Sequence, residues 1–102
     1  MSSVGRGNRN VRTKNYKSLL EKMGQRAAAQ ADDAYRLFLE NPEHPMLENH
    51  ALHDSKHGRH RNGSRAVSVT YRIRAIYVID GDTNVWYWIG THEAYNVFTG
   101  KK

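Results

Sequence analysis

Apolar residues recur at helical spacing in the first half of the chain. Four of them fall at positions i, i+3, i+4 and i+7 of one helical face: Tyr16, Leu19, Leu20 and Met23. Thr13 is a suitable N-cap before them, and a second apolar stripe, Ala27 to Leu39, follows Gly24. Because a residue before proline avoids the α region, this segment should end at Asn41-Pro42. The pattern predicts a helical hairpin, or one long helix bent at Gly24.

Apolar and polar residues alternate strictly in the second half of the chain. One face carries Val67, Val69, Tyr71, Ile73, Ala75, Tyr77 and Ile79, and the other carries Ser68, Thr70, Arg72 and Arg74. This period of two predicts strand, but the run is longer than most single strands, so we expect a turn near Thr70–Arg72. Asp80-Gly81-Asp82 is a hairpin signal, and a central strand with Trp86 and Trp88 should follow it. His92 to Phe98 form a short terminal segment.

The order of these elements indicates an α+β fold. Helices first and strands afterwards favour an N-terminal helical hairpin packed on one face of a small antiparallel sheet. With 102 residues the chain has room for one domain, which we place at 13–102. Residues 1–12 are rich in Gly, Ser, Asn and Arg, so they should form either a flexible basic tail or a short edge strand.

The charge balance narrows the classes of partner. Lys and Arg number 16 against 10 Asp and Glu, a net charge of +6 that attracts polyanions. Nucleic acid is the first candidate, an acidic protein the second and an anionic membrane the third; the alternative is a basic surface that only confers solubility. There is no cysteine, and neither a signal peptide nor a membrane span is visible. We therefore expect a cytoplasmic protein without a membrane partner.

Five of the six histidines lie between residues 41 and 64. His50, His53, His57 and His60 would align in a helix, which raises the possibility of a zinc site. Gly58 argues against a stable helix there, and no Cys or Glu cluster supports a metal, so solvated loop histidines are the better interpretation. We expect no metal and no cofactor.

The C-terminal third resembles a pattern common in toxins of the RelE/ParE superfamily. The resemblance is densest at residues 66–95 and rests on the run Trp-x-Trp-Ile-Gly-x-His-x-x-Tyr, which spans Trp86 to Tyr95. Asn41-Pro42, His44-Pro45, Leu47 and His50-Ala-Leu52 also match the family. The resemblance implies a microbial-ribonuclease-like sheet with two N-terminal helices. Most such toxins cleave mRNA in the ribosomal A site without a metal and are neutralised by a bound antitoxin, whereas the ParE branch inhibits DNA gyrase.

The residues needed for metal-free RNA cleavage are present. Such cleavage requires a base for the ribose 2′-OH, an acid for the 5′-oxygen, and cations for the charge that develops on phosphorus. By resemblance, His92 and Tyr95 belong to the active site, and His50 fits the position of a catalytic loop residue. Arg72 and Arg74 lie on the polar strand face and could clamp a phosphate; alternatively, they are solvated or pair with Glu93 or Asp80.

The segment from residue 50 to residue 61 is the richest in basic groups. A role in phosphate contacts is expected for His53, Lys56, Arg59, His60 and Arg61. Ser68 stands where relatives often have a basic residue, so that phosphate contact is either missing or moved to Arg65. Trp86 and Trp88 could stack on bases, but packing in the core is the better interpretation.

The sequence thus predicts the toxin of a type II toxin–antitoxin system, an endoribonuclease that cleaves mRNA at the ribosome. Its partners would be a cognate antitoxin, mRNA and the ribosome, with a homodimer or a toxin–antitoxin hetero-oligomer possible. A ParE-like gyrase inhibitor, or a nucleic-acid-binding relative without catalysis, are the alternatives. Sharing a fold does not decide between these functions.

Overall fold

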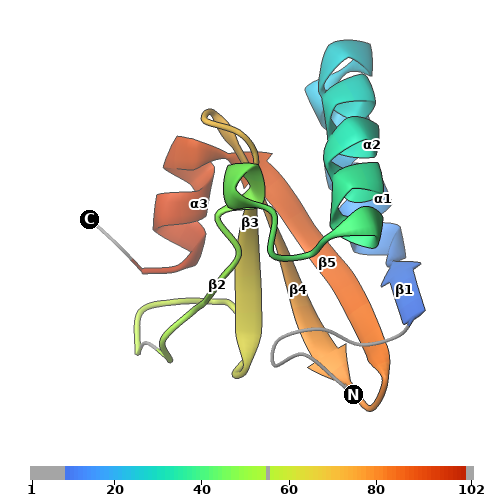
Figure 1. The fold of residues 1–102 in the computed structure, drawn as a ribbon. Helices are drawn as coiled ribbons and strands as arrows, with labels where there is room; N and C mark the ends of the chain where they lie inside the picture. Colours follow the sequence, from blue (N-terminus) through green and yellow to red (C-terminus); the bar gives the residue numbers. More distant parts are fainter. Residues whose placement is uncertain (1–8, 55, 101–102) are drawn as a thin grey trace.

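The computed structural model describes residues 9–54 and 56–100 and has the expected α+β architecture (Figure 1). The helical elements are α1 (Lys14–Met23), α2 (Gln25–Glu40), the 3-10 turn η1 (Pro45–Leu47) and α3 (His92–Phe98). The strands are β1 (Arg9–Arg12), β2 (His50–Ala51), β3 (Ser64–Thr70), β4 (Ile73–Asp80) and β5 (Thr83–Thr91). They form a five-stranded sheet in the order β1-β5-β4-β3-β2.

The N-terminal helices form the expected pair. Thr13 caps α1, since its Oγ1 accepts a hydrogen bond of 3.1 Å from the Tyr16 N–H. Gly24 separates α1 from α2 with a φ of 96°, a conformation that suits glycine because it has no Cβ. The break predicted at Gly24 is therefore confirmed. In the described part of the chain, no helix combines the length and the apolar character that crossing a membrane requires.

The sheet is antiparallel from β2 to β5, as expected, but mixed overall because β1 runs parallel to β5. β1 is an edge strand, one of the two forms expected for residues 1–12, while residues 1–8 lie outside the described residues. Asn10 fastens β1 to β5. Its Oδ1 accepts hydrogen bonds from Asn84 Nδ2 at 3.1 Å and from Trp86 Nε1 at 3.0 Å.

Both predicted hairpin turns are present. Thr70 pairs with Ile73, so Tyr71 and Arg72 form the two-residue turn between β3 and β4. Asp80 pairs with Thr83 across the turn between β4 and β5. The long alternating run is therefore two strands, as its length indicated.

Helices cover both faces of the sheet, and not one face as expected. Figure 1 shows α1 and α2 on one side of the sheet and α3 on the other. The core under α1 and α2 includes Tyr16, Ala27, Ala31, Phe38, Leu47, Val67, Ile73, Ala75, Tyr77, Trp86 and Ile89. The smaller core under α3 consists of Leu52, Ala66, Ile76, Trp88 and Tyr95. The terminal segment thus forms a helix because it has an apolar sheet face to cover.

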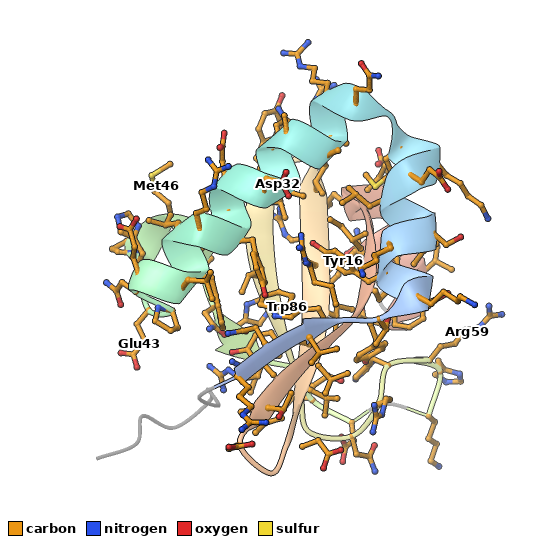
Figure 2. All side chains as sticks on the ribbon, turned by 90° about the vertical axis from the view of Figure 1, so that its right-hand side faces the viewer. Tyr16, Asp32, Glu43, Met46, Arg59 and Trp86 are labelled. Atoms are coloured by element: carbon orange, nitrogen blue, oxygen red, sulfur yellow. The ribbon has the colours of Figure 1, made fainter. Side chains whose placement is uncertain are left out.

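A bulge in β5 separates the two tryptophans. Ile76 pairs with Trp88 and Tyr77 pairs with Trp86, so Tyr87 is an extra residue in this strand. Trp86 therefore lies under α1 and α2, close to Tyr16 (Figure 2), while Trp88 lies under α3. They are 2% and 8% exposed, which confirms core packing over base stacking.

Candidate functional site

His50 and Tyr95 meet on the sheet face that α3 covers. His50 pairs with Ala66 in the sheet, and residues directly opposite each other point to the same face. Tyr95 reaches this point from α3, and its Oη lies 3.4 Å from His50 Nε2. The other ring nitrogen of His50, Nδ1, lies 2.8 Å from the carbonyl oxygen of Glu48. A carbonyl only accepts, so Nδ1 carries the hydrogen and, in the neutral ring, Nε2 presents its lone pair.

Tyr95 is a buried member of this site. It is 2% exposed and packs in the core under α3. Burial raises the pKa of the Tyr95 hydroxyl, and the nearby positive charge of Arg74 lowers it in part. The hydroxyl therefore keeps its proton at neutral pH and can donate to His50. This burial favours positioning of His50 over direct contact with a substrate.

His92 is an exposed residue at the start of α3, beside the turn between β3 and β4. Its backbone N–H donates to the Arg72 carbonyl oxygen at 2.7 Å, which ties the helix to this turn. Thr91 caps the helix by accepting from the Ala94 N–H at 3.1 Å. The ring centroids of His92 and Tyr95 are 6.2 Å apart. Tyr95 therefore lies close to both histidines: its hydroxyl is near His50 and its ring is near His92.

Arg74 belongs to the same sheet face, whereas Arg72 does not continue its strand. Arg74 pairs with Ser68 on one side and Gly90 on the other, and its Nη1 donates to the Thr70 carbonyl oxygen at 2.7 Å. Arg72 lies in the turn, so the two side chains do not project together from one strand. Neither forms an ion pair with Glu93 or Asp80 among the described contacts.

The basic segment after β2 folds back against α3 and β5. The Arg59 N–H donates to the Phe98 carbonyl oxygen at 2.6 Å, and the Arg61 N–H donates to Tyr87 Oη at 2.8 Å. His60 Nε2 lies 2.8 Å from the His53 carbonyl oxygen, so this half-buried ring has a structural contact. The side chains of His53, Lys56, Arg59 and Arg61 are exposed. Among residues 9–54 and 56–100, no group of three or more His, Cys, Asp or Glu is placed to hold a metal.

Arg65 is separated from the other candidates. It pairs with Tyr77, which belongs to the core under α1 and α2, so Arg65 lies on the opposite face of the sheet from His50 and Arg74. Its Nε donates to Asn49 Oδ1 at 3.0 Å, and Asn49 Nδ2 donates to Tyr77 Oη at 3.0 Å. The structure therefore gives Arg65 a place in a structural network.

Glu48 joins the site through Ser68, although the sequence did not single Glu48 out. Glu48 has a φ of 48°, an uncommon left-handed backbone for a residue other than glycine. Its Oε1 accepts a hydrogen bond of 2.7 Å from Ser68 Oγ, and Ser68 pairs with Arg74. The Glu48 carboxylate thus lies close to the sheet face that carries His50 and Arg74. These contacts join positions 20 residues apart, and no short motif signals them.

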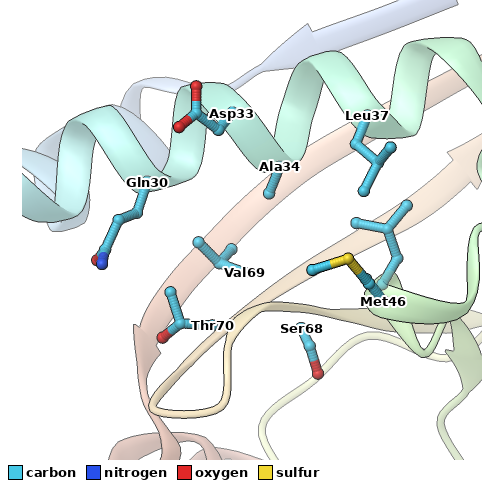
Figure 3. A pocket seen from close by; sticks show the side chains of 9 residues that line it. Gln30, Asp33, Ala34, Leu37, Met46, Ser68, Val69 and Thr70 are labelled. Atoms are coloured by element: carbon cyan, nitrogen blue, oxygen red, sulfur yellow. The ribbon is translucent and has the colours of Figure 1, made fainter.

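Two surface hollows differ in chemistry. The one between η1, α2 and β3 has a volume of about 260 Å³, and Figure 3 shows Ala34, Leu37, Met46 and Val69 facing it. The other has a volume of about 520 Å³ and is lined by Tyr71, Arg72, Thr91, His92 and Glu93. The first hollow also includes Ser68, whereas the second contains His92.

The fold is that of RelE-type toxins of type II toxin–antitoxin systems. No protein-family model and no curated protein sequence matches the chain. Among solved structures, YafQ from Escherichia coli matches with a TM-score of 0.66 at 17% identity, over 84% of this chain and 94% of that one. A copper-bound mutant toxin from Helicobacter pylori matches with a TM-score of 0.62 at 16% identity, over 84% and 96%. The RelBE2 toxin–antitoxin complex from Mycobacterium tuberculosis matches at 0.58 and 19%, over 84% and 99%.

Proposed function

We propose that this protein is the toxin of a type II toxin–antitoxin system and cleaves mRNA on the ribosome. The observation that carries this proposal is the meeting of His50, His92 and Arg74 around Tyr95. These residues come from β2, α3 and β4, and the contact between Tyr95 Oη and His50 Nε2 spans 45 positions of sequence. Two imidazoles and a guanidinium on one face supply the acid, base and cation that metal-free cleavage needs.

His50 acts as the general base in the proposed reaction. Its Nε2 exchanges the long 3.4 Å contact with Tyr95 Oη for the ribose 2′-OH and takes the proton of that hydroxyl, while the 2′-oxygen forms a bond to phosphorus. His92, in its protonated form, gives a proton to the 5′-oxygen as the bond between phosphorus and that oxygen breaks. The products are a 2′,3′-cyclic phosphate and a 5′-hydroxyl. Arg74 stabilises the negative charge on the phosphoryl oxygens, and Arg72 binds a neighbouring phosphate.

The remaining candidates position groups or hold the RNA. Tyr95 orients His50, because its hydroxyl remains protonated while its ring is fixed in the core. Exposed cations of the 50–61 segment, such as Lys56, Arg59 and Arg61, contact the phosphate backbone without reading its sequence. A net charge of +6 supports binding to ribosomal RNA and mRNA alike.

The proposed partner is a cognate antitoxin with an acidic surface. The matching structures include the DinJ–YafQ toxin–antitoxin complex from Escherichia coli and RelBE2 from Mycobacterium tuberculosis. An acidic protein that covers the basic face would be attracted to it by complementary charge and would exclude RNA. Association of the two should therefore weaken as salt concentration rises.

Induced expression in bacteria tests the proposal. The wild type should arrest growth and create new mRNA 5′ ends within translated codons, whereas His50→Ala and His92→Ala should do neither. His44→Asn is the matched control, because it removes an imidazole outside the site and keeps an acceptor for the Met46 N–H. Arrest without cleavage, unchanged in both variants, would reject the ribonuclease and direct the work to DNA gyrase. Absence of arrest would indicate a relative without catalysis.

A further inference from the structure

Tyr71 is an exposed aromatic residue beside the candidate site that the proposed reaction does not use. It is 75% exposed and lies in the turn between β3 and β4. The guanidinium of Arg72 lies 5.3 Å from its ring centroid, and Arg72 Nε donates to Tyr71 Oη at 2.9 Å. These contacts hold the ring in place. Tyr71 also lines the hollow of about 520 Å³ that extends to His92 and Glu93.

We propose that this hollow binds one guanine base of the RNA, next to the phosphate that is cleaved. The inference rests on the proposed function, since it names the base that the same site selects. Unpaired bases stack on aromatic side chains and on guanidinium planes, and the turn presents both, from Tyr71 and Arg72. Because His92 lines the same hollow, a base held there carries its own phosphate towards the proposed acid.

Glu93 gives the hollow its preference among bases. An ionised carboxylate only accepts hydrogen bonds, through two adjacent oxygens. Guanine alone presents two adjacent donors on one edge, N1–H and N2–H₂. Adenine and cytosine place an acceptor nitrogen beside their amino group, and uracil flanks its single N–H with two carbonyls. Each of these three bases would therefore set a lone pair against the carboxylate.

Thr91 complements this pattern. Its Oγ1 accepts from the Ala94 N–H, so its own hydroxyl hydrogen remains able to donate. Guanine carries a carbonyl oxygen, O6, beside N1–H. Thr91 and Glu93, which both line the hollow, thus offer the one donor and the paired acceptor that the edge of guanine requires.

Binding of short 2′-O-methyl RNAs, which lack the attacking hydroxyl, tests the inference without cleavage. RNAs that differ only in guanine, inosine or adenine at one position are compared by fluorescence anisotropy. Inosine lacks the N2 amino group, and a lost hydrogen bond to a charged acceptor should weaken binding about 10- to 150-fold. Tyr71→Ala should weaken binding of the guanine RNA by about 5- to 150-fold. Tyr71→Phe loses the hydrogen bond from Arg72 Nε but keeps the ring and its contact with the Arg72 guanidinium, so it should retain most of the binding.

Glu93→Gln should remove the preference for guanine over inosine. Glu40→Gln, which removes the same charge from an exposed position on α2, should leave that preference intact. Equal binding of the three RNAs, or an unchanged preference in Glu93→Gln, would overturn the inference, as would no binding by the folded protein.

Cleavage of the same sequences, with free 2′-hydroxyls and placed in mRNAs bound to ribosomes, separates the two proposals. Cleavage without a guanine preference would leave the ribonuclease standing and reject the base site. A guanine preference in binding, without any cleavage, would support the base site and reject the ribonuclease.

Discussion

Gly90→Ala should destabilise the fold through a single contact on the sheet face under α3. A Cβ on Gly90 would lie 2.5 Å from Cη2 and 2.8 Å from Cζ2 of the Trp88 ring, well inside the 3.4–4 Å of ordinary contact. The ring cannot move away easily, because Trp88 is 8% exposed and stacks on Phe98 with a centroid distance of 4.8 Å. The cause would be overpacking and not backbone strain, since the φ of Gly90 is not positive.

The expected size follows from two opposing effects. Alanine in place of glycine inside a strand should stabilise by about 0.5–1 kcal/mol, because the unfolded chain loses freedom. Overpacking of a filled core costs about 1–3 kcal/mol, and an approach of 2.5 Å belongs in the upper half of that range, about 2–3 kcal/mol, so the sum should be a loss of about 1–2.5 kcal/mol. For a domain of this size, each kcal/mol lowers Tm by about 4–8 °C.

Thermal and urea unfolding of four proteins measure this effect: the wild type, Gly90→Ala, Trp88→Phe and the double variant. Phenylalanine lacks the outer ring that carries Cη2 and Cζ2, so Trp88→Phe should lose stability alone but relieve the clash in the Gly90→Ala background. The double variant should therefore be more stable than the sum of the single losses predicts. A Gly90→Ala variant as stable as the wild type, or an additive cycle, would refute the overpacking argument.

Three further outcomes follow from the contacts described above. Arg74→Ala should lower kcat/KM for RNA cleavage by about 10²- to 10³-fold, whereas Arg65→Ala, on the other sheet face, should leave cleavage by the folded protein nearly unchanged; steady-state assays compare them. Asn10→Ala should cost about 1–3 kcal/mol in urea unfolding, because it removes the acceptor of the Trp86 Nε1–H, and equal stability would contradict this. Burial raises the pKa of Tyr16 from the ordinary value of 10.0 to about 12, so at pH values between the two the folded protein keeps a proton that the unfolded chain releases. The free energy of unfolding should therefore fall by up to about 3 kcal/mol as the pH rises from 10.0 to about 12. Urea unfolding at several pH values measures this decrease, which should be smaller in Tyr16→Phe.

Patterns of period two and local turn residues predicted much of the sheet. The alternation from Val67 to Ile79 and the turn at Asp80-Gly81-Asp82 depend on neighbours in sequence, so they are visible without a structure. The parallel strand β1 and the helix α3 depend on contacts with residues distant in sequence: β1 pairs with β5, and α3 packs on the sheet. Four residues of β1 carry almost no pattern, and the bulge at Tyr87 shifts which face each tryptophan takes.

The candidate site could be predicted only in part, because local patterns are visible in the sequence and contacts between distant residues are not. His92, Tyr95 and His50 were found through a motif, and the structure brings them together. Glu48 reaches the site only because its backbone turns left-handed after η1, which sequence periodicity does not report. Arg65 is a candidate only because Ser68 stands where relatives often have a basic residue, but strand register puts Arg65 on the face opposite His50 and Arg74.

The position of β5 in the sheet has a consequence for synthesis of the chain. β5 lies between β1 and β4, although it is the last strand to leave the ribosome. The apolar faces of α1 and α2 cannot pack on Trp86, and Asn10 Oδ1 cannot accept from Trp86 Nε1–H, until Trp86 is synthesised. Trp86 follows Asn10 by 76 residues. A nascent chain of this topology therefore exposes apolar helices until its final third emerges. The same third carries Arg74, His92 and Tyr95, so the core and the candidate site are completed together.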